Sequence, residues 1–102
     1  MPSRISLAPE VLEDFERILE HLNKHDVENA EQRIELIIDA INVLELNPLI
    51  GRPAENNKRE LVIGRRAKGY VALYRYIEPI DTVFVLAIRS QREAGYTNDE
   101  TR

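Results

Sequence analysis

The sequence predicts an α+β fold with the element order β-α-α-β-β-β, in which a helical hairpin packs on a mainly antiparallel sheet. In the first half of the chain, apolar residues recur at the spacing of amphipathic helices. In the second half, three short runs rich in β-branched and aromatic residues are separated by brief polar segments, as in a meander of hairpins. We expect a single domain over residues 1–96 and a disordered tail over residues 97–102.

The first half begins with a short strand, Arg4 to Leu7, and continues as two helices. The first helix is predicted from Pro9 to Leu22, because proline suits the first helical position and an apolar stripe follows it. That stripe consists of Val11, Phe15, Ile18 and Leu22. Asp26 can cap the second helix. Because apolar residues cover more than one face of this second helix, we expect the helix to contact both the first helix and the sheet. The place of the first strand within the sheet stays open.

The three strands of the second half are predicted at residues 59–63, 70–77 and 82–89. Strict alternation of side chains turns one set toward the helices, namely Val71, Leu73, Phe84, Leu86 and Ile88. The same rule places a second set on the opposite face, namely Tyr70, Tyr74, Tyr76 and Arg89. Arg75 is an exception, because alternation turns its charge toward the helices, where it needs a partner or an exit to solvent.

Charge is distributed unevenly along the chain, although the formal net charge is only -4. Residues 1–50 are strongly acidic, whereas residues 51–92 carry an excess of arginine and lysine. A basic half on an acidic protein favours an anionic partner, either nucleic acid or an acidic peptide. An ordinary, well-solvated surface explains the same charges about as well.

Several classes of function find no support in the sequence. The absence of cysteine excludes disulfides, thiol nucleophiles and thiolate metal sites. No metal-binding, P-loop, nucleophile-elbow or dinucleotide-binding motif is present, so we expect neither a metal nor a cofactor. Both histidines, His21 and His25, lie far along the sequence from the basic half and are interpreted as surface or capping residues. Without an apolar run of transmembrane length or a signal peptide, we expect a soluble, cytoplasmic protein that makes no membrane contact.

The candidate functional surface is the polar tip, Arg89 to Glu93, which follows the most hydrophobic strand of the chain. The candidate target-binding residues are Arg65, Arg66, Lys68, Arg89, Arg92 and Tyr96. Arginine and lysine can stabilise the charge that develops during RNA cleavage, while a tyrosine or glutamate moves the proton. A docking surface that performs no chemistry is the alternative. We favour this alternative from the sequence and assign no catalytic residue.

Three segments of the chain match a known pattern: the loop LNPLIGRP, the strand pair RELVIGRRAKGYVALYRY and the ending VFVLAIRSQREAGY. Within them, four motifs are specific in combination, namely GRP at Gly51 to Pro53, REL at Arg59 to Leu61, LYR at Leu73 to Arg75 and IRxQREAGY at Ile88 to Tyr96. Over nearly its whole length the chain resembles the ParE branch of the RelE/ParE toxins of bacterial type II toxin-antitoxin systems.

The resemblance implies a compact toxin that inhibits DNA gyrase by binding and that a ParD-like ribbon-helix-helix antitoxin neutralises in a hetero-oligomer. The RelE relatives instead cut mRNA on the ribosome. Many ParE relatives carry histidine where this chain has Ser90, and the RelE-type groups are matched only by Arg89 and Tyr96. Gyrase inhibition is therefore the first interpretation, ribosome-dependent mRNA cleavage the second, and a non-toxic interaction module the third.

Overall fold

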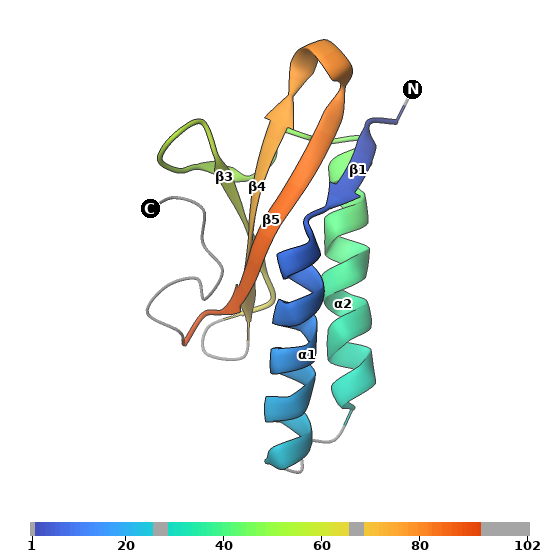
Figure 1. Ribbon diagram of the computed structural model, residues 1–102, viewed down its shortest axis with the longest axis vertical. Coiled ribbons are helices and arrows are strands. Elements are labelled where there is room, and N and C mark those ends of the chain that lie inside the picture. The colour runs from blue at the N-terminus through green and yellow to red at the C-terminus, as the bar shows by residue number, and fades with distance from the viewer. Residues whose placement is uncertain (1, 26–28, 66–68, 93–102) are drawn as a thin grey trace.

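The computed structural model describes residues 2–25, 29–65 and 69–92. It confirms the α+β fold, in which two helices cover one face of a sheet with the strand order β1-β5-β4-β3-β2 (Figure 1). The strands are β1 (Arg4–Leu7), β2 (Arg52–Pro53), β3 (Arg59–Ile63), β4 (Tyr70–Ile77) and β5 (Thr82–Ser90). The helices are α1 (Pro9–Lys24) and α2 (Ala30–Asn42), and the short 3-10 helices are η1 (Val43–Glu45) and η3 (Glu78–Ile80).

The sheet is mixed, because β1 lies at its edge and runs parallel to β5. The amide of Ala8 donates to the carbonyl of Val85 at 2.9 Å, after which the chain turns directly into α1. β3, β4 and β5 form the predicted antiparallel meander. β2, which was not predicted, lies within the segment LNPLIGRP that was expected to be a loop, and it pairs with β3. Its Pro53 suits an edge strand, because proline has no amide hydrogen to donate.

The two helices follow the prediction, with differences at their ends. α1 begins at Pro9 as predicted and continues to Lys24, beyond the predicted end at Leu22. α2 begins at Ala30 and follows Asn29, whose φ of 65° lies in the left-handed region. The predicted cap, Asp26, lies outside the described residues.

The predicted assignment of faces is wrong for β4 and for Phe84 in β5, whereas Ile88 and Arg89 lie on the predicted faces. The core between sheet and helices contains Tyr70, Ala72, Tyr74, Val83, Val85 and Ile88, and Tyr76 packs against it. Two features of the strands explain the error. The tyrosine rings supply the large apolar area that this layer needs, which alternation alone does not reveal. A β-bulge between the pairs Leu73–Ala87 and Tyr74–Val85 leaves Leu86 without a partner, so that β5 changes phase.

The open face of the sheet is the side turned away from α1 and α2. Three cross-strand pairs lie on it, namely Val71 with Arg89, Leu73 with Ala87, and Arg75 with Phe84. Arg75 is therefore no exception to the alternation in β4, because it points away from the helical layer. The arginine that the sequence left unexplained shares the open face with Arg89.

Candidate target-binding surface

The tip is held at the end of the sheet where three strands meet. Ile63 pairs with Tyr70, and Tyr70 pairs with Ser90. The amide of Gln91 donates to the carbonyl of Gly69 at 2.9 Å, which keeps the chain attached to β4 just beyond β5. A side chain at Gly69 would come within 2.7 Å of the carbonyl oxygen of Ile63, so glycine is needed for this close approach.

Three of the six candidate residues belong to the described structure. Arg89 is half-buried on the open face, and its Nη1 donates to the carbonyl of Ser90 at 3.1 Å. Arg65 and Arg92 are exposed and follow β3 and β5 at the same end of the sheet. The structure thus brings three cations to one end of the sheet. The other candidates, Arg66, Lys68 and Tyr96, lie outside the described residues.

A carboxylate on α1 fixes the strand that carries Arg89. Asp14 is fully buried, and its Oδ2 accepts a hydrogen bond from the amide of Ile88 at 2.9 Å. Arg17 donates through Nη2 to Asp14 Oδ1 at 3.2 Å and to the carbonyl of Ile88 at 3.1 Å. β1 pairs with β5 only as far as Val85, so beyond that point the side chains of Asp14 and Arg17 supply the hydrogen bonds to the backbone of β5, at Ile88. We call Asp14, Arg17 and Ile88 the clamp.

The sequence contains a signal for the clamp that our prediction missed. Asp14 stands between Val11 and Ile18, at the helical spacing of the buried stripe of α1. A charged residue inside an apolar stripe is seldom buried without a partner. The pattern alone therefore indicates a specific polar contact, although it does not identify Ile88 as the group bound.

Two further cations, Arg75 and Lys58, lie away from the tip. Arg75 is on the open face opposite Phe84, and Lys58 directly precedes β3, which begins with the pair Arg59–Tyr74. Lys58 is only 4% exposed. The Nη2 of Arg75 donates to the carbonyl of Asn56 at 3.1 Å, while its Nε is buried without a hydrogen-bond partner among the described residues.

The side chains of Tyr74 and Tyr76 in β4 do not contribute to the tip, and Tyr70, which pairs with Ser90, belongs to the core on the helical side of the sheet. Burial raises the pKa of Tyr74, although the hydrogen bond that its hydroxyl accepts from the amide of Gly51 at 2.8 Å acts in the opposite direction. The hydrogen bond to Asp81 raises the pKa of Tyr76. Both side chains pack on the helical side of the sheet. An interpretation that needs a tyrosine beside Arg89 consequently depends on Tyr96.

Asp81 holds the opposite end of the sheet together. It accepts hydrogen bonds at Oδ1 from the hydroxyl of Ser3 at 2.6 Å and from that of Tyr76 at 2.7 Å. Both hydrogen bonds lower the pKa of Asp81, and the bond from Ser3 has the larger effect. The group ties the start of β1 to the turn between β4 and β5, and it lies at the far end of β5 from the tip.

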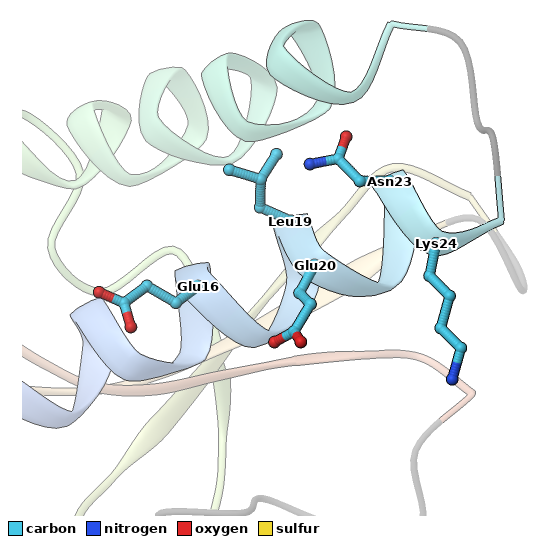
Figure 2. Close-up of a pocket in the computed structure, with 5 residues that line it drawn as sticks. All are labelled: Glu16, Leu19, Glu20, Asn23 and Lys24. Atoms are coloured by element: carbon cyan, nitrogen blue, oxygen red, sulfur yellow. The ribbon is translucent and has the colours of Figure 1, made fainter.

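A shallow pocket lies on α1, on the helical side of the molecule. It is lined by Glu16, Leu19, Glu20, Asn23 and Lys24. Figure 2 shows Leu19 and Asn23 pointing from α1 toward α2, while the charged ends of Glu20 and Lys24 point away from α2. Leu12 is 60% exposed and lies two helical turns before Leu19 on the same side of α1. This side of the hairpin thus offers apolar area bordered by charge.

The described residues include neither a metal-binding cluster nor a membrane-spanning helix. No three His, Cys, Asp or Glu side chains of residues 2–25, 29–65 and 69–92 are grouped so as to hold a metal ion. His21 and His25 are both exposed, and their rings lie 4.4 Å apart between centroids. In the same described part of the chain, no helix combines the length and the apolar character needed to cross a membrane.

Comparisons with known proteins give a consistent result. A family model described as the ParE toxin of type II toxin-antitoxin system, parDE, matches residues 5–95. A free-state structure of an Escherichia coli RelE toxin carrying two arginine-to-alanine changes is similar, with a TM-score of 0.62, 14% identity, and coverage of 92% of this chain and 88% of that one. The toxin-antitoxin complex RelBE2 from Mycobacterium tuberculosis gives a TM-score of 0.57 and 19% identity, covering 89% of this chain and 100% of that one. No curated protein matches the chain significantly.

Proposed function

Since the chain belongs to the ParE toxin family of type II toxin-antitoxin systems, we propose that it inhibits DNA gyrase by binding through the tip and performs no chemistry of its own. Arg89 and Arg92 are the central contacts in this proposal, with Arg65 beside them. Arg66, Lys68 and Tyr96 remain candidates that the described structure does not reach.

The observation that carries the proposal is the clamp. Both backbone polar groups of Ile88 are held by α1, directly before Arg89. A side chain that follows a fixed backbone loses less conformational freedom on binding, which favours its use as a central contact in an interface. Exposed cations on either side add a positive field that speeds association with an anionic surface.

A binding mode is favoured over RNA cleavage by the groups that the described residues supply. Cleavage needs a group that moves a proton near neutral pH as well as cations for the phosphate. The described part of the open face offers cations, while the tyrosines with raised pKa face the helices. The similarity to the RelE structures concerns the fold alone. Ribosome-dependent mRNA cleavage is the competing function, and the test below distinguishes it from gyrase inhibition.

The proposed regulator is a cognate, ParD-like antitoxin that forms a hetero-oligomer with this chain. The RelBE2 structure pairs a toxin of similar fold with its antitoxin. On this chain, the exposed Leu12 and the pocket around Leu19 suit the apolar stripe of a partner helix. An acidic antitoxin segment would meet the basic half of the toxin, so we expect the affinity to fall as salt rises from low to high concentration. Calorimetry that finds no salt dependence would place the antitoxin elsewhere.

The function is tested by running two assays on the same purified proteins. Wild type, Arg89→Ala and Arg92→Ala are titrated into a gyrase supercoiling reaction and into a translation reaction with intact mRNA. Each variant should need more toxin for the same inhibition, by about tenfold for every 1.4 kcal/mol of lost contact, and should inhibit fully at higher concentration. Arg4→Ala is the matched control, because Arg4 is an exposed arginine at the other end of the sheet.

The opposite result is equally distinct. If the wild-type protein cuts mRNA at defined codon positions, if those cuts vanish with Arg89→Ala, and if supercoiling proceeds undisturbed, then the binding proposal is wrong and the ribonuclease interpretation replaces it. A lost catalytic group lowers the rate by about a hundredfold or more at any toxin concentration, so excess protein does not restore the activity.

A further inference from the structure

The C-terminal end of α1 carries two imidazole rings side by side. His21 and His25 are four residues apart, and both side chains are exposed. Although His25 follows the last residue of α1, its amide still donates to the carbonyl of His21 at 3.2 Å, which is the hydrogen bond of a continuing helical turn. The two side chains are therefore neighbours on one face of the helix. Their ring centroids lie 4.4 Å apart, and the ring planes meet at 60°.

The distance between the two rings fits a pair of imidazoles that share one metal ion. A bound ion lies about 2.0–2.1 Å from the ligating nitrogen, which places it about 3.2 Å from the ring centroid. Two rings bound at a right angle then have centroids about 4.5 Å apart, whereas a tetrahedral angle separates them by about 5.2 Å. The observed distance of 4.4 Å matches the right angle, which is the angle between adjacent ligands in square-planar and tetragonal sites.

The ring nitrogens can converge on an ion without a movement of the helix. The centroid of an imidazole lies close to the line of its Cβ–Cγ bond, so rotation about this bond turns the nitrogens and leaves the centroid in place. The preference of histidine for particular values of this torsion is weak, so the rotation costs little free energy. The distance between the centroids is thus the part of the geometry that the backbone fixes, and it is already suitable.

The electrostatic surroundings also favour a cation at this place. The last carbonyl groups of α1 carry partial negative charge, which stabilises positive charge near the C-terminal end of a helix. Arg17, one turn before His21, lies 3.2 Å from the carboxylate of Asp14, which offsets its charge. Lys24 is exposed, and its flexible stem allows the ammonium to turn away from an ion.

We propose that His21 and His25 together bind a divalent transition-metal ion, Cu²⁺ most tightly and Ni²⁺ after it. Both ions accept nitrogen ligands at right angles, and Cu²⁺ has the highest affinity of the first-row divalent ions. The site departs from the expectation of no metal, which was drawn from known motifs. It has two protein ligands, unlike the clusters of three that are absent from the described residues, so water fills the other positions of the ion.

The open positions of the ion give the site a possible use in recognition. The pocket on α1 is lined in part by Asn23 and Lys24, which lie between the two histidines in the sequence (Figure 2). A partner bound at this pocket can replace a water on the ion with a carboxylate or imidazole of its own. The metal site itself requires no partner, and it holds whichever target the tip binds.

Calorimetric titration of CuCl₂ into the untagged chain, in a buffer that does not bind metals, tests the proposal. We expect one strongly bound ion per chain. A side chain that only orients a ligand contributes about 10–100-fold to metal affinity, so His21→Ala and His25→Ala should each weaken binding about tenfold or more. The double variant should lose this binding. The matched control is Glu13→Gln, which removes an exposed carboxylate from the same helix and should bind as the wild type does.

Electron paramagnetic resonance of the Cu²⁺ complex identifies the ligands directly. The spectrum should show splitting from two nitrogens in the wild type and from one nitrogen in each single variant, a difference that a change in stability alone does not produce. Titrations with NiCl₂ and ZnCl₂ should give tighter binding for Ni²⁺ than for Zn²⁺, because the right angle does not suit a tetrahedral ion.

Three results would overturn the proposal. If the double variant binds Cu²⁺ as tightly as the wild type, the ion lies elsewhere on the chain. If either single variant binds as tightly as the wild type, or if the wild-type spectrum shows one nitrogen, the two imidazoles do not act together. If Zn²⁺ binds more tightly than Ni²⁺, the assigned geometry is wrong. Circular dichroism of each variant shows that the helices are retained, so that a loss of affinity reports the loss of a ligand.

Discussion

Replacing Asp14 by alanine tests whether the clamp holds α1 to the sheet. The substitution leaves the amide of Ile88 without its buried acceptor, which costs about 1–3 kcal/mol. Arg17 also loses its carboxylate, but its side chain is 32% exposed and can turn to solvent, so this loss adds about 1 kcal/mol at most. The expected total is about 1–4 kcal/mol. For a domain of this size, each 1 kcal/mol lowers the melting temperature by about 4–8 °C, so we expect a melting temperature lower by about 4–30 °C.

Thermal and urea unfolding of matched variants measure this cost. Asp14→Asn keeps an oxygen for the amide of Ile88 and should lose only about 1 kcal/mol. Glu13→Ala removes an exposed carboxylate from the same turn of α1 and should change stability by less than about 0.5 kcal/mol. If Asp14→Ala costs no more than Glu13→Ala, the clamp contributes nothing to stability and the reasoning about Arg89 loses its basis.

Two further predictions concern the rest of the sheet. Tyr74→Phe leaves the amide of Gly51 without its hydrogen-bond partner and should lower the free energy of unfolding in urea by about 1–2 kcal/mol. Gly51→Ala should lower it further, because the added Cβ would lie 2.7 Å from the ring of Tyr74. A larger loss for Tyr74→Phe than for Gly51→Ala would contradict this packing. Asp81 has a folded-state pKa below its ordinary 3.8, so the stability it contributes is present above that pH and is lost as pH falls through the folded-state value. The difference in unfolding free energy between wild type and Asp81→Asn should therefore be largest near neutral pH and should shrink toward zero in acid. A difference that stays constant with pH would show that the hydrogen bonds from Ser3 and Tyr76 do not depend on the negative charge of Asp81.

The local features of the fold were readable from the sequence, because each depends on residues close together in the chain. The strands over residues 59–63 and 70–77 were predicted with the bounds that the structure has. Their apolar and β-branched runs end at glycines and polar residues, which mark strand ends clearly. The start of α1 at Pro9 was equally clear. Parallel pairing of β1 with β5 joins distant segments and leaves no local mark, so its place could not be predicted.

The faces of the sheet were predicted wrongly for a physical reason. Alternation assumes an unbroken ladder, and the bulge at Leu86 breaks it in the middle of β5. No glycine or proline marks that position in the sequence. Arg89 was nevertheless expected on the face away from the helices, where the structure places it. Its support by Asp14 was missed, because the contact joins residues that are far apart in the sequence.

The short edges of the sheet limit how another protein can attach to it. β1 contributes four residues at one edge, and the side chains of the clamp occupy β5 beyond it. At the other edge β2 pairs only with Arg59 and Glu60, which leaves residues 61–63 of β3. An incoming strand would find few backbone groups to bond, which protects the chain from pairing with copies of itself. Partners are therefore left to recognise side chains and helical surfaces, where a sequence can change its specificity without changing its fold.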